Sequence, residues 1–135
     1  MDYANYKRLN VEQVGGVLTV ELSQPQRRNA MDEVMHGELP DLWRQIAKDR
    51  SVRVVVVKGD PAGKAFCAGG DLKWVSDAAQ SGERYEEILR DGVDIVRGMT
   101  QLPQPVITMI NGSAIGVGAA NSKPSWTRIP WQPGQ

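Results

Sequence analysis

The sequence predicts an α/β fold, in which helices pack against a mostly parallel β-sheet. Residues 53–59 contain four consecutive valines, a pattern typical of a strand buried on both faces of a parallel sheet. Apolar side chains recur at helical spacing between residues 83 and 102, which indicates an amphipathic helix. A second apolar run, at 105–110, leads into a glycine-rich loop. This order of strand, helix, strand and loop favours the α/β class.

The first third of the chain adds a hairpin and a further helix. Residues 6–14 and 17–22 are rich in β-forming side chains and are separated by two glycines, as in a β-hairpin. Residues 23–29 are polar and predict a loop before a helix that begins near Met31. Pro40 should kink or interrupt this helix, because proline lacks an amide donor and its ring clashes with the preceding turn.

Composition limits the classes of function. The chain has 135 residues, 41% of them hydrophobic and 24% charged, which fits one globular domain. Sixteen Lys and Arg residues balance sixteen Asp and Glu residues, so no positive surplus favours nucleic acid. No apolar run reaches the roughly 20 residues that a membrane-spanning helix needs. Together with the single cysteine and a polar start without a signal-peptide pattern, this predicts a cytoplasmic protein without nucleic-acid or membrane partners.

Three segments carry the functional signal. They are Arg-Arg-Asn-Ala-Met at 27–31, Ala-Phe-Cys-Ala-Gly-Gly-Asp-Leu at 65–72 and Ile-Asn-Gly-Ser-Ala-Ile-Gly-Val-Gly at 110–118. In order and spacing they resemble the CoA-contacting loop and the two oxyanion-hole loops of the enoyl-CoA hydratase/isomerase (crotonase) family. The resemblance runs from about residue 8 to residue 120. It implies a crotonase-like spiral ββα fold, truncated before completion, with a domain at 1–120 and a tail at 121–135 that we expect to be disordered.

The same resemblance implies the site. The backbone N–H groups of Gly70 and Val117 would form an oxyanion hole for a thioester carbonyl, and small neighbours would leave room for that approach. The substrate would be an acyl-CoA, whose coenzyme A is part of the substrate, so neither a separate cofactor nor a metal is expected. Family members usually form homotrimers or hexamers and carry out hydration, isomerisation or related enolate chemistry. The implied substrate-binding residues are Arg28, Ala30, Ala68, Asp71, Leu72 and Gly116, with Arg27 as a further candidate for the CoA phosphates.

Some of these residues also have a structural interpretation. Asp71 fits the N-cap of a short helical segment at 71–75, and we favour this role over a general base. Cys67 has no histidine partner in a recognisable motif, since His36 lies in a predicted helix, so we expect a buried thiol and not a nucleophile.

Two accounts of activity stay open. Hydratases of this family place one glutamate at the position of Ala120 and another further along the chain, so the acid and base of a hydratase are not supplied here. The chain is therefore an enzyme of this type or a truncated, non-catalytic fragment of one. In the second case, strand 106–110 and residues 115–119 would leave an exposed apolar patch. A weaker third hypothesis is an interaction module that uses Trp126 and Trp131 as anchors.

Overall fold

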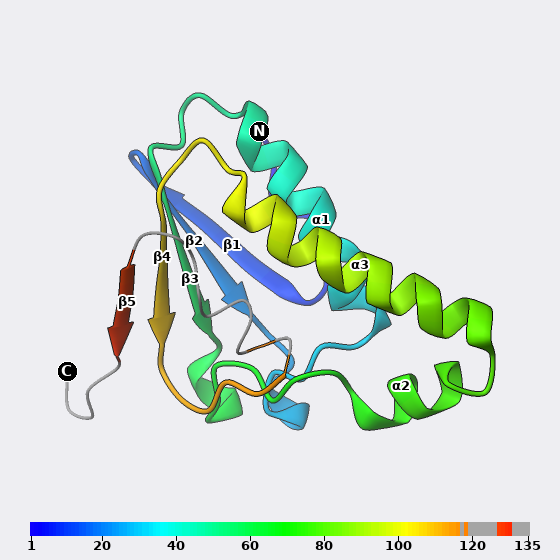
Figure 1. Ribbon diagram of the computed structural model, residues 1–135. Helices are drawn as coiled ribbons and strands as arrows, with labels where there is room; N and C mark the ends of the chain where they lie inside the picture. The colour runs from blue at the N-terminus through cyan, green and yellow to red at the C-terminus, as the bar shows by residue number, and fades with distance from the viewer. Residues whose placement is uncertain (117, 119–126, 131–135) are drawn as a thin grey trace.

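The fold is a single β-sheet with helices on one face, seen in a computed structural model that describes residues 1–116, 118 and 127–130 (Figure 1). Within this part, β1 pairs antiparallel with β2, and β2, β3, β4 and β5 pair in parallel in the sheet order β1-β2-β3-β4-β5. The strands are β1 (Leu9–Val14), β2 (Val17–Leu22), β3 (Val54–Gly59), β4 (Val106–Ile110) and β5 (Thr127–Pro130). The helices are α1 (Glu33–Lys48), α2 (Leu72–Ala78) and α3 (Gly82–Thr100), with short 3-10 turns η1 (Pro25–Arg27) and η2 (Pro61–Gly63).

Helix α1 is continuous through Pro40, so the expectation of an interruption there was wrong. The helix begins where the Asp32 carboxylate accepts a hydrogen bond from the amide of Met35, at 2.9 Å. Proline inside a helix costs about 3 kcal/mol, whereas each large apolar side chain that becomes buried contributes about 1.5–3 kcal/mol. The buried face of α1 outweighs this cost, with Met35, Leu39, Leu42, Trp43 and Ile46 all buried.

Strand β3 is fully buried on one face only, which corrects the expectation of burial on both. Val55 and Val57 are buried against the helices, while Val54 and Val56 are half-buried. The reason is that α1 and α3 lie side by side on the same face of the sheet (Figure 1), and no described helix covers the other. On that second face, Lys58 Nζ lies 3.2 Å from a carboxylate oxygen of Glu21.

Helix α3 is amphipathic as predicted, and its C-terminal half packs on the core through Ile95 and Met99. Its exposed apolar side chains are Tyr85 and Leu89 in the N-terminal half and Val93 just past the middle. The patch expected on β4 is reduced, because Val106 is buried and the remaining apolar residues of the strand are half-buried. None of the described helices is long and apolar enough to cross a membrane.

Strand β5 lies inside the segment 121–135, for which disorder was expected. For residues Thr127–Pro130 the structure differs from that expectation, since they pair in parallel with β4. An open sheet edge offers main-chain groups to any extended segment, and proline is tolerated on an edge strand. Pairing of a segment with such an edge therefore does not require an alternating pattern of side chains in its sequence. The other residues of the tail, including Trp126 and Trp131, lie outside the described residues, as do Val117 and Ala120.

Candidate functional site

The three segments singled out in the sequence lie together at one edge of the sheet. They follow the carboxyl ends of β2, β3 and β4, and these ends share an edge because the strands are parallel. The first two loops are joined by main-chain hydrogen bonds from Met31 to the carbonyl of Gly69, at 2.7 Å, and from Asp71 to that of Met31, at 2.8 Å. The second and third are joined by a hydrogen bond from the amide of Ile115 to the carbonyl of Cys67, at 3.0 Å.

Glycines allow the second and third loops to approach closely. A Cβ atom on Gly112 would lie 2.8 Å from Cα of Ala65, and one on Gly118 would lie 2.7 Å from Cβ of Cys67. Cys67 is completely buried in this contact, as expected, and burial raises the pKa of its thiol. Small residues are therefore needed here for packing between the loops.

Asn29 connects the first loop to the turn after β3. The side chain is completely buried, and its Oδ1 accepts a hydrogen bond from the amide of Gln24 at 3.1 Å. Its Nδ2 donates to the carbonyl oxygens of Asp60 and Ala65, at 3.0 and 2.9 Å. The backbone has a φ of 56°, in the left-handed region that asparagine tolerates better than most residues. Asn29 thus fixes the path of the loop that carries Arg28 and Ala30.

Gly70 lies just before α2 and presents an unpaired amide. Among the described residues, the Gly70 N–H makes no hydrogen bond. Gly70 lines a pocket of about 950 Å³, and Gly116 of the third loop lines the same pocket. Gly116 has a φ of 57°, a conformation that favours glycine. The second expected donor, Val117, lies outside the described residues.

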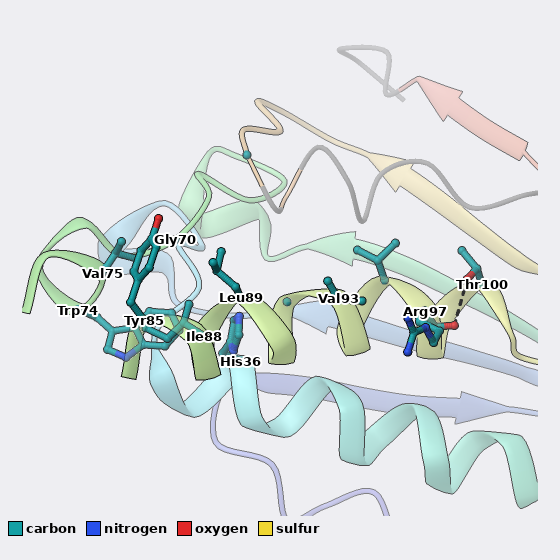
Figure 2. A pocket seen from close by; sticks show the side chains of 13 residues that line it. His36, Gly70, Trp74, Val75, Tyr85, Ile88, Leu89, Val93, Arg97 and Thr100 are labelled. Atoms are coloured by element: carbon teal, nitrogen blue, oxygen red, sulfur yellow. Dashed lines mark hydrogen bonds between the residues drawn. The ribbon is translucent and has the colours of Figure 1, made fainter. Parts of the chain in front are cut away.

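The pocket is walled mainly by apolar side chains of α2 and α3 (Figure 2). The apolar repeat of α3 predicted a helix face, and nothing in that repeat indicated that the same side chains form the wall of a pocket. A histidine also lines the pocket and was not assigned to the site. The lining side chains from these helices include Trp74, Val75, Tyr85, Ile88, Leu89, Val93 and Val96, with His36 from α1 and Arg97 and Thr100 from the end of α3.

Asp71 caps α2, as predicted. One carboxylate oxygen accepts a hydrogen bond from the amide of Trp74 at 3.1 Å, and the other pairs with Nη1 of Arg27 at 2.5 Å. The Trp74 amide, with a further contribution from Arg27, holds the pKa of Asp71 below its usual range, although burial of the carboxylate opposes this. Because its own amide donates to Met31, the polar groups of Asp71 are engaged within the loops.

The other expected substrate-binding residues differ in accessibility. Arg28 is exposed and donates to the carbonyl of Lys64 at 3.4 Å, whereas Arg27 is held by Asp71. Ala30 is buried, Ala68 is half-buried, and Leu72 is 86% exposed. Arg28 and Leu72 are therefore the two of these residues whose side chains are most open to a ligand.

The family model described as Enoyl-CoA hydratase/isomerase matches residues 17–130 of the chain. The chain belongs to this family. The match extends past residue 120, the end of the resemblance inferred from the three segments, and it includes β5.

Known relatives agree with the assignment. The 1,2-epoxyphenylacetyl-CoA isomerase of Escherichia coli K12 is 35% identical over 106 residues, which cover 77% of this chain and 40% of that protein. The crystal structure of an enoyl-CoA hydratase from Bacillus anthracis superposes with a TM-score of 0.83 at 29% identity, covering 92% of this chain and 47% of the other. An enoyl-CoA hydratase/isomerase structure from Xanthobacter autotrophicus Py2 gives a TM-score of 0.84 at 29% identity, covering 93% and 46%. The chain spans less than half the length of these relatives, and over that length the predicted crotonase-like α/β fold is confirmed.

Proposed function

We propose that the chain binds acyl-CoA thioesters and polarises the thioester carbonyl with backbone amides, as an enzyme of the enoyl-CoA hydratase/isomerase type. The observation that carries the proposal is the N–H of Gly70, which has no hydrogen-bond partner among the described residues and belongs to a residue that lines an apolar pocket together with Gly116 of the third loop. A main-chain donor without a partner in such a site is suited to a carbonyl oxygen that gains negative charge.

The chemistry requires donors that are already in place. When the α-carbon or β-carbon of a thioester reacts, charge moves onto the carbonyl oxygen, and one preorganised donor lowers the barrier by about 3 kcal/mol. We assign the first donor to Gly70 and, from the family resemblance, the second to Val117. The network that holds Gly69 and Asp71 to Met31 supports this role, because it fixes the peptide groups on both sides of Gly70.

Coenzyme A would lie across the first loop. Arg28 is exposed beside this loop, and its guanidinium can form charge-assisted hydrogen bonds to phosphate. We propose that Ala30, Ala68, Leu72 and Gly116 flank the bound thioester and its pantetheine arm. We further propose a cytoplasmic location and the trimeric or hexameric assembly usual for the family.

A second candidate is an acyl-CoA-binding chain without efficient turnover. By the family resemblance, Ala120 stands where hydratases of the family have a glutamate. General acid and base catalysis typically contributes about 10²–10⁴-fold. Under this candidate, acyl-CoA binding is retained while hydration or isomerisation is slower by a factor of that order.

Titration calorimetry of the folded chain with an acyl-CoA and with free coenzyme A tests the proposal. Gly70→Pro removes the proposed donor. Gly70→Ala is its matched control, because it keeps the N–H and adds a Cβ whose one close neighbour among the described residues is Cγ2 of Val75, at 3.1 Å, which has to shift by a few tenths of an ångström. We expect Gly70→Pro to bind the acyl-CoA about fivefold more weakly than Gly70→Ala, which is the value of one hydrogen bond of about 1 kcal/mol. Equal affinity of the two variants, with circular dichroism showing both folded, would contradict the proposal.

A further inference from the structure

His36 is a polar side chain in an otherwise mainly apolar pocket wall. It projects from α1 toward α3 (Figure 2), lines the same pocket as Gly70 and Gly116, and has a side chain that is only 6% exposed. The ring of Trp74 lies edge-on to the imidazole, with 5.0 Å between the ring centroids. The pocket therefore brings a buried imidazole and the proposed thioester site into one cavity.

Neither nitrogen of this imidazole makes a hydrogen bond within the described part of the chain. The carboxylate nearest to it belongs to Asp91, with 4.0 Å between Oδ2 and the histidine Nδ1, which is longer than a hydrogen bond. Burial lowers the pKa of His36 below 6.5, and the carboxylate of Asp91 opposes this only in part. At neutral pH the ring is thus uncharged, with one nitrogen as donor and the other as acceptor.

A glycine leaves one of these nitrogens accessible. Gly92 of α3 lines the pocket, and a Cβ atom at this position would lie 3.7 Å from Nε2 of His36. Glycine is unfavourable inside a helix compared with alanine, so its presence here has no benefit for α3 itself. The missing side chain leaves Nε2 of His36 open toward the cavity.

We propose that His36 is a specificity-determining residue whose Nε2 forms a hydrogen bond with a polar substituent on the acyl group of the bound thioester. The pocket would then favour an apolar acyl group that carries one hydroxyl or similar group away from the thioester, over the unsubstituted acyl group. This inference rests on the proposed function, because it assumes that the acyl group enters the pocket lined by Gly70. A hydroxyl group suits either tautomer of the imidazole, since it both donates and accepts.

The test compares binding of phenylacetyl-CoA with that of its 2-, 3- and 4-hydroxy derivatives by titration calorimetry. In the unmodified chain, at least one hydroxy derivative should bind about fivefold more tightly than phenylacetyl-CoA, as expected for one additional hydrogen bond. His36→Leu should reduce this ratio to about one, while His36→Gln, which keeps a polar group of similar reach, should retain part of it.

Two glycine variants separate access to His36 from effects on folding. Gly92→Ala should also bring the ratio to about one, because its methyl group screens Nε2, and it should leave α3 at least as stable. Gly37→Ala is the matched control, since a Cβ at this α1 position has no atom within 4 Å, and it should keep the ratio of the unmodified chain. Circular dichroism verifies that each variant is folded.

The outcomes distinguish this inference from the function on which it rests. If phenylacetyl-CoA binds but no hydroxy derivative binds more tightly, or if the ratio is unchanged in both His36→Leu and Gly92→Ala, the role of His36 is refuted and acyl-CoA binding stands. If none of the four thioesters binds to the folded chain, both proposals are refuted.

Discussion

Replacement of Asn29 by alanine should be among the most destabilising single changes in the loops. The side chain makes three hydrogen bonds to main-chain groups of Gln24, Asp60 and Ala65, each worth about 1 kcal/mol. Alanine at a φ of 56° adds a cost of about 1 kcal/mol. The expected loss is therefore about 4 kcal/mol, a large share of the 5–15 kcal/mol that stabilises a typical domain.

Urea denaturation followed by circular dichroism measures this loss as a change in the free energy of unfolding. Asn29→Gly should recover about 1 kcal/mol relative to Asn29→Ala, because glycine adopts positive φ without strain. The matched control is Asn10→Ala, which removes one exposed hydrogen bond to Glu21 and should change stability by no more than about 0.5 kcal/mol. A loss below about 1 kcal/mol for Asn29→Ala would refute the view that this side chain holds the first loop to the turn after β3.

Three further predictions follow from the same loops. Arg28→Gln should weaken acyl-CoA binding without changing stability. The difference in affinity should shrink at high salt, because the side chain is exposed and salt screens its charge. A loss of affinity that does not depend on salt in calorimetric titrations would contradict a contact between Arg28 and the CoA phosphates. The pKa of Asp71 is depressed in the folded chain, so its carboxylate contributes stability at neutral pH that is lost as the pH falls below the usual carboxyl value near 3.8. Asp71→Asn should therefore flatten the acid limb of a plot of unfolding free energy against pH. An acid limb that is unchanged in this variant would contradict the stabilising role of Asp71. Gly112→Ala should destabilise the chain by about 2 kcal/mol, because its Cβ would lie 2.8 Å from Cα of Ala65. In thermal denaturation, the control Gly82→Ala should lower the melting temperature much less, since a Cβ there has no atom within 4 Å. Equal decreases in the two variants would refute the close packing of the loops at Gly112.

Local patterns were sufficient for most elements of the fold. The paired glycines after Val14 and the valine run at Val54 predicted β1, β2 and β3 to within about three residues, because these signals lie within single segments. The continuity of α1 through Pro40 could not be predicted in this way, since it depends on the burial of side chains against other elements. The half-buried second face of β3 and the pairing of β5 likewise depend on which segments meet in space.

The candidate site was predictable where short motifs carry it. The glycine loops around Gly70 and Gly116 and the N-cap at Asp71 could be read from sequence, and the structure joins these loops by hydrogen bonds. The partnership of Arg27 with Asp71 spans 44 positions, and no local period encodes it. The contact of His36 with the α3 wall is hidden for the same reason, because it depends on how two distant helices pack.

The most direct test of the account is infrared spectroscopy of an acyl-CoA that carries ¹³C in its thioester carbonyl. If the Gly70 amide donates to this carbonyl, the C=O stretch of the bound ligand should shift to lower wavenumber in the unmodified chain and in Gly70→Ala, because a hydrogen bond withdraws electron density from the C=O bond. Gly70→Pro should lose a large part of that shift while still binding the ligand. The same shift in all three proteins, or a bound carbonyl that absorbs as it does free in water, would contradict the proposed oxyanion site.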